Sequence, residues 1–87
     1  MTRDEFIKWF NADGIKSAEI IDGENHVYML TVGDFKFKTK PTKNPFYVSL
    51  YDLTVGTACI RRRIGCNIID VWDAIHTYLY AKLVWNK

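Results

Sequence analysis

The spacing of apolar and polar positions changes twice along the chain. In residues 2–11 the apolar side chains recur three and four residues apart, which is the spacing of one helix face. From residue 15 to residue 65 apolar and polar side chains tend to alternate, as they do in strands with one buried face. From residue 68 onward the helical spacing returns. The pattern therefore predicts a helix, a series of strands and a second helix.

The first helix is predicted from its N-terminal capping signal. Thr2 and Glu5 have the spacing of a capping box, in which each side chain accepts a hydrogen bond from the backbone of the other residue. Asp13-Gly14 is expected to stop the helix, because glycine readily adopts the left-handed conformation found at helix ends. The expected apolar side of the helix consists of Phe6, Trp9 and Phe10.

Five strands are expected between the helices, at residues 16–21, 26–32, 35–40 and in the hairpin 46–65. Gly33-Asp34 suits a tight turn. The two prolines of the segment KPTKNP interrupt the alternation before the hairpin. We predict a single small α+β domain, residues 1–87, in the order α-β-β-β-β-β-α. Its sheet should be an antiparallel meander with the long C-terminal helix packed across one face.

The turn of the 46–65 hairpin sets the expected register of its strands. A loop of Thr54, Val55 and Gly56 places glycine at the left-handed third position, whereas a two-residue turn would require a positive φ at valine. The expected pairs on the buried face are then Leu50 with Ile60, Val48 with Arg62 and Phe46 with Ile64. On the polar face, Ser49 should oppose Arg61 and Tyr47 should oppose Arg63.

The last helix, residues 68–86, is expected to supply the main anchor of the core. Asn67 is a favourable N-cap residue, and Asp70 lies in the first turn, where the helix dipole favours an acid. Trp72 is expected at the centre of an apolar stripe formed by Ile68, Trp72, Ile75, Leu79 and Leu83. The first helix should then pack at an end or edge of the sheet, or on its other face.

Basic side chains are expected to gather on the sheet face opposite the last helix. Two cross-strand rows are predicted there, one of Lys38, Tyr47 and Arg63 and one of Lys36, Ser49 and Arg61. The candidate partner-binding residues are Lys36, Lys38, Tyr47, Tyr51, Arg61 and Arg63. Cations on a solvated strand face also keep sheet edges soluble, and this simpler interpretation stays open.

Composition limits the classes of function that fit the chain. The formal net charge is only +2, from 12 basic and 10 acidic residues, which is little for a protein that binds nucleic acid through its total charge. The two cysteines form no disulfide framework, and no apolar run is long enough to cross a membrane. We therefore expect a cytoplasmic protein with reduced thiols.

No residues have the spacing of a catalytic or metal site. Cys59, Cys66, His26 and His76 are the soft metal ligands, and they form neither a CxxC nor an HxxxH pair. Asp70 and Asp73 are expected to be solvated helix acids, and no phosphate-binding or nucleophile motif occurs. The expectation is a protein that is not an enzyme and that uses no cofactor or metal.

Two hypotheses of function follow. The first is a non-enzymatic protein-binding module, because tyrosine, tryptophan and arginine are favoured at interfaces. Small size and absence of motifs are typical of accessory proteins of phages and mobile elements, including inhibitors of host defence enzymes. The alternative is a single-stranded nucleic-acid-binding domain that uses a basic, tyrosine-bearing sheet face. A homodimer through Tyr80, Val84 and Trp85 of the last helix is also possible on this pattern.

Overall fold

The computed structural model describes residues 1–85. Helix α1 spans Arg3–Phe10, and helix α2 spans Ile68–Tyr80 and continues as a π-helical turn, η1, over Ala81–Trp85. The strands between them are β1 Lys16–Asp22, β2 Val27–Val32, β3 Phe35–Pro41, β4 Tyr47–Asp52 and β5 Ala58–Gly65. No helix within residues 1–85 is both long and apolar enough to cross a membrane.

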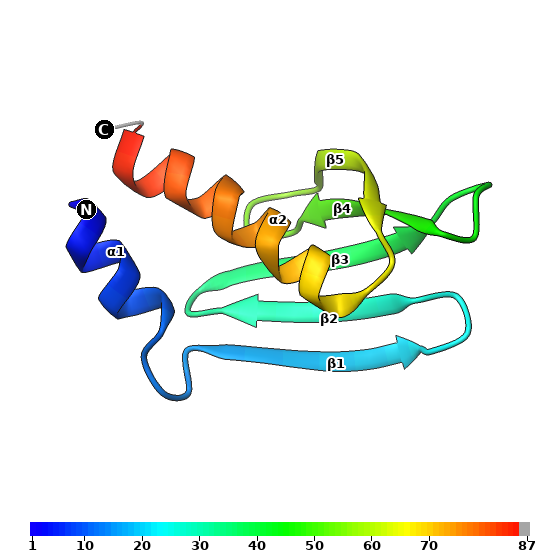
Figure 1. The fold of residues 1–87 in the computed structure, drawn as a ribbon, viewed down its shortest axis with the longest axis horizontal. Helices are drawn as coiled ribbons and strands as arrows, with labels where there is room; N and C mark the ends of the chain where they lie inside the picture. The colour runs from blue at the N-terminus through cyan, green and yellow to red at the C-terminus, as the bar shows by residue number, and fades with distance from the viewer. Residues whose placement is uncertain (86–87) are drawn as a thin grey trace.

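The five strands form one antiparallel meander in the order β1-β2-β3-β4-β5, as the sequence predicts. Helix α2 lies across one face of this sheet, and α1 lies beside the C-terminal end of α2 (Figure 1). Val32 pairs with Phe35, so Gly33-Asp34 forms the expected tight turn between β2 and β3. The expected α+β fold is therefore confirmed.

Helix α1 begins as its sequence predicts and lies at one end of the sheet, beside the C-terminal end of α2, which is one of the predicted placements (Figure 1). Thr2 caps the helix, and the Thr2–Glu5 capping box is complete. Phe6 is fully buried, and its ring centroid lies 5.1 Å from that of His76 and 5.3 Å from that of Tyr80. The helix ends at Phe10 with Asn11 as its C-cap residue, close to the predicted end at about Asn11, and Gly14 after it has the expected positive φ, 76°.

The core lies between the sheet and the two helices. Its fully buried side chains come from every element except β1, β5 and η1, and the largest apolar ones are Phe6, Phe37, Leu30, Leu50, Ile75, Leu79, Val32, Val48 and Val71. Strand β1 contributes no buried residue, and residues 16–21 are exposed. The core is thus one-sided, and it is filled from the helical side of the sheet.

The buried stripe of α2 shares only Ile75 and Leu79 with the predicted one. Val71, Ala74, Ile75 and Leu79 are buried, whereas Trp72 is half-buried and packs at the margin of the core. The expectation that Trp72 is the central anchor is therefore wrong. Asn67 caps the helix as expected, accepting a hydrogen bond from the backbone N–H of Ile69 over 3.0 Å. The predicted end of the helix at residue 86 falls outside the described residues.

The register of β4 and β5 agrees with the prediction only near the turn. Tyr51 pairs with Cys59 and Asp52 with Ala58, as a three-residue loop requires. Beyond that point two register shifts intervene, so that Leu50 pairs with Arg61 and Val48 with Ile64. The predicted pairs Leu50–Ile60, Val48–Arg62 and Phe46–Ile64 are therefore wrong. Phe46, expected to be buried, is 73% exposed.

A partly buried hydrogen bond connects α2 to the sheet. The Tyr78 hydroxyl donates to the Asp52 carboxylate over 2.8 Å. Burial pushes the pKa of Asp52 upward, but hydrogen bonds from Thr54 and Tyr78 and the charge of Lys82 outweigh this and hold the pKa below its usual value. Burial and the hydrogen bond to Asp52 raise the pKa of Tyr78 to about 12.

The first prediction tests which face of α2 carries the core. Ile75 is fully buried and Ile69 is 65% exposed, so the two isoleucines of one helix form a matched pair. Ile75→Ala should lower the free energy of unfolding by roughly 2–5 kcal/mol, because it leaves a cavity. Ile69→Ala should change it by less than about 0.5 kcal/mol. Urea unfolding measures both, and equal losses would contradict the assignment of the buried face.

The second prediction concerns alkaline pH. Because the pKa of Tyr78 is raised above its unfolded value of about 10, its stabilising effect is complete below about pH 10 and is lost as the pH rises toward 12. The difference in unfolding free energy between wild type and Tyr78→Phe should therefore shrink over that interval. Urea unfolding at a series of pH values measures this difference. Parallel curves for the two proteins would show that Tyr78 does not carry the effect.

Candidate functional site

One face of the sheet is left uncovered by the helices within residues 1–85. Residues that pair across neighbouring strands lie on the same face of a sheet. One row of such partners runs across β2 to β5 and consists of Met29, Lys38, Tyr51 and Cys59. This row lies on the side opposite the buried Leu30, Phe37 and Leu50. The pairs Thr31–Lys36 and Lys40–Ser49 lie on the same side. We call this side the open face. It carries Lys36, Lys38, Lys40, Tyr47, Ser49, Tyr51 and Arg63.

The structure rearranges both predicted rows of basic residues. Lys38 pairs with Tyr51 and not with Tyr47, which pairs with Gly65 at the far end of β4. Ser49 pairs with Lys40 rather than aligning with Lys36. Both predicted rows are therefore wrong. Five of the six predicted binding residues nevertheless lie on the open face: Lys36, Lys38, Tyr47, Tyr51 and Arg63. Whether these residues bind a partner stays a prediction.

Two cations of the open face lie over tyrosine rings. The Lys40 ammonium is 4.6 Å from the centroid of the Tyr51 ring. The Arg63 guanidinium carbon is 5.6 Å from the centroid of the Tyr47 ring. Such contacts attract the cation to the π electrons and restrict the motion of long side chains. The open face therefore presents cations whose positions are partly fixed before any partner arrives.

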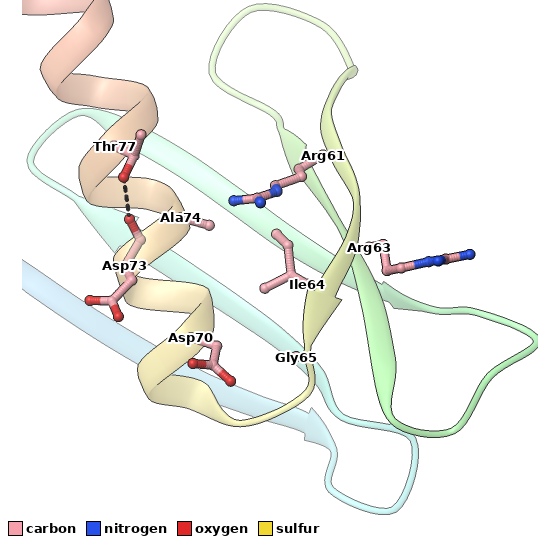
Figure 2. Close-up of a pocket in the computed structure, with 8 residues that line it drawn as sticks. All are labelled: Arg61, Arg63, Ile64, Gly65, Asp70, Asp73, Ala74 and Thr77. Carbon is pink, nitrogen blue, oxygen red and sulfur yellow. Dashed lines mark hydrogen bonds between the residues drawn. The ribbon is translucent and has the colours of Figure 1, made fainter.

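Arg61 lies on the other side of the sheet, against the prediction. It pairs with the fully buried Leu50, and Figure 2 shows its guanidinium directed toward α2 while Arg63 points away from that helix. It borders a hollow of about 260 Å³ that Asp70 and Asp73 also line. Arg63 lines the hollow as well, so two cations and two acids share it and it offers no concentrated charge of one sign. The Thr77 hydroxyl at its wall donates to the backbone carbonyl of Asp73 over 3.0 Å.

The register shifts of β5 explain why neighbouring arginines face different ways. Between the pairs Val48–Ile64 and Leu50–Arg61, the single residue Ser49 opposes both Arg62 and Arg63. This arrangement is a β-bulge, which re-aims side chains that would otherwise alternate between faces. The Ser49 hydroxyl donates to the Arg62 carbonyl across the bulge over 3.2 Å. Arg62, expected to point inward, is exposed on the outer side with Arg63.

The two arginines line a pocket at the end of the open face. Its volume is about 230 Å³, and its lining residues are Thr42, Lys43, Asn44, Tyr47, Arg62 and Arg63. We call it the basic pocket. Of its six lining side chains, three are cationic and none is acidic. Glu24 borders an adjoining hollow of about 140 Å³, which shares Thr42, Lys43, Asn44 and Tyr47 with the basic pocket.

Hydrogen bonds brace the loop that forms one wall of the basic pocket. The Thr42 hydroxyl lies 2.8 Å from the carbonyl oxygens of both Asn44 and Tyr47, between which its single hydrogen is shared. The Asn44 side-chain oxygen accepts from the backbone N–H of Phe46 over 2.9 Å, and the Tyr47 N–H donates to the Asn44 carbonyl over 3.1 Å. Lys43 is therefore presented from a loop whose backbone is held in one conformation.

Three cations that lie on the open face or line the basic pocket were missing from the predicted set of binding residues: Lys40, Lys43 and Arg62. The alternating pattern of β3 could have identified Lys40, since it places Lys36, Lys38 and Lys40 on one face. Arg62 could not be found by alternation, because the bulge breaks the alternation at that residue. Lys43 lies in a loop, where periodicity carries no information about side-chain direction.

The residues predicted to support a homodimer are only partly available. The Tyr80 ring contacts Phe6 and also lies 5.3 Å from the Trp85 ring, so it takes part in the packing of α1 against α2. Val84 is half-buried against the core, and Trp85 is 70% exposed. The homodimer stays a prediction, with Trp85 as its most exposed residue among the three.

Comparison of the chain with protein families, with curated proteins and with solved structures gave no match. The proposals below therefore rest on the geometry of the chain.

Proposed function

We propose that the protein is a non-enzymatic, cytoplasmic binding module that docks an acidic protein surface on the open face. The observation that carries this proposal is the pair of cations over tyrosine rings, Lys40 over Tyr51 and Arg63 over Tyr47. Tyrosine and arginine supply much of the energy of protein interfaces, and cations fixed in place lose less entropy on binding.

The same observation favours a protein over single-stranded nucleic acid. A nucleic-acid-binding sheet needs aromatic rings on which bases can stack. Here one face of each tyrosine ring already lies against a cation of the protein, and Tyr51 is half-buried. The cations stay available for carboxylates, whereas one face of each ring is no longer free to stack on a base.

The third prediction tests the open face by charge reversal. Lys36→Glu with Lys40→Glu changes two exposed side chains and should abolish capture of an acidic protein from a nuclease-treated bacterial lysate, because reversed charges repel the partner. The matched control, Lys8→Glu with Arg61→Glu, makes the same change of net charge away from the open face and should capture normally. Quantitative mass spectrometry of the bound fraction measures capture and identifies the partner, including whether it is a host defence enzyme.

Two outcomes would contradict the proposal. Equal loss of capture in both double variants would show that total charge, and not the open face, attracts the partner. Loss of all bound material on nuclease treatment would favour the single-stranded nucleic-acid alternative. Circular dichroism should show that the variants keep the fold of the wild type, since exposed charges change stability by less than about 0.5 kcal/mol.

A further inference from the structure

The basic pocket differs from the rest of the open face in how its charges converge. Lys43 comes from the loop before β4, whereas Arg62 and Arg63 come from β5, so three cations from two segments surround one hollow. Three positive charges held near one another repel, and an anion in the hollow relieves that repulsion. The hollow on the helical side has no such excess of one charge, because its two cations, Arg61 and Arg63, are matched by Asp70 and Asp73.

The bulge in β5 is what allows two consecutive arginines to line one pocket. In a regular strand Arg62 and Arg63 would point to opposite faces of the sheet. Because both oppose Ser49, both reach the same hollow. Bulges at sheet edges commonly re-aim side chains beside functional sites. The geometry therefore concentrates arginine at a point where alternation would have dispersed it.

The pocket is also organised in advance of binding. Arg63 is held over the Tyr47 ring, and the hydrogen bonds of Thr42 and Asn44 fix the loop that carries Lys43. Groups fixed in place beforehand lose less conformational entropy when a ligand binds. A volume of about 230 Å³ leaves room for a small anion together with the first atoms of the group that bears it.

We propose that the basic pocket binds a phosphate monoester. A carboxylate carries one charge, whereas a phosphate monoester carries about 1.5 to 2 negative charges near neutral pH and several acceptor oxygens. Arginine donates two parallel hydrogen bonds to phosphate, and lysine adds a point charge. Two arginines and one lysine therefore match the charge and the donor demand of a phosphate group better than those of a single carboxylate.

This inference rests on the proposed function for the source of the phosphate. If the open face docks a protein, the phosphate arrives on a phosphorylated side chain of that partner, and the remaining cations of the face meet the partner's acidic residues. Arginine clusters recognise phosphorylated segments in this way. The chemistry of the pocket itself, recognition of a phosphate monoester, can be tested on the isolated protein.

The fourth prediction uses phenyl phosphate and inorganic phosphate as probes in a titration followed by amide and arginine side-chain NMR signals. Both probes should give saturable shifts centred on residues 42–47 and 62–63, and acetate at equal ionic strength should not. Arg62→Gln and Arg63→Gln should each weaken binding by about tenfold, which corresponds to the loss of one charge-assisted hydrogen bond. Arg61→Gln is the matched control, since it removes one arginine from the same strand and should leave binding unchanged.

Three results would overturn the inference. Shifts scattered over the lysines of the sheet, an equal response to acetate, or equal weakening by Arg61→Gln would each show nonspecific attraction of anions. The failure of this inference can be told from the failure of the proposed function. If phosphate does not bind but an acidic protein is still captured, only the phosphate site is wrong. If phosphate binds at the pocket and no protein is captured, only the proposed function is wrong.

Phosphatase treatment of the lysate separates the two sources of phosphate. Loss of capture after treatment would show that the phosphate is carried by a protein side chain. Undiminished capture, together with binding of free phosphate to the isolated protein, would overturn the protein-borne source and assign the pocket to a small phosphorylated molecule.

Discussion

The helices cover only one face of the sheet, and most other properties of the structure follow from this constraint. Leu30, Phe37 and Leu50 are fully buried beneath α1 and α2, so the apolar residues of the strands must point to that side. The alternate residues then face water, where a sheet needs polar side chains to stay soluble. The architecture by itself therefore accounts for the presence of cations on the open face. Only the arrangement of these cations bears on function.

Strand β5 departs from the regular alternation that this constraint imposes on β2, β3 and β4. A first bulge inserts Ile60 beside Arg61, and both residues lie on the helical side, Ile60 packing against the core. A second bulge brings Arg62 and Arg63 together at the opposite side. A strand at the edge of a sheet tolerates such irregularity, because only one neighbour needs its hydrogen bonds. Of the three consecutive arginines, Arg61 therefore lies on the helical side of the sheet, and Arg62 and Arg63 lie on the opposite side.

These bulges also mark the limit of what the sequence could predict. Alternation and turn chemistry were enough for the number and order of the strands, and the turn at Gly56 gave the correct pairs next to it, such as Tyr51 with Cys59. Each bulge adds one residue to β5, and nothing in the local sequence of β5 predicted the added residues. The prediction of the buried stripe of α2 failed for a different reason. Positions three and four apart are shared by overlapping stripes, and tertiary contacts selected Val71 rather than Trp72.

The modest net charge of +2 affects how the basic pocket can act. A protein with a large positive charge attracts every polyanion over long distances, and its binding falls steeply with salt. Here 10 acidic residues nearly cancel 12 basic ones, so the long-range field is weak and any selectivity must arise at short range. Cations that converge on one hollow satisfy that requirement, because their combined potential is strong only within about a Debye length. The arrangement therefore favours a partner that presents one compact, doubly charged group over an extended polyanion.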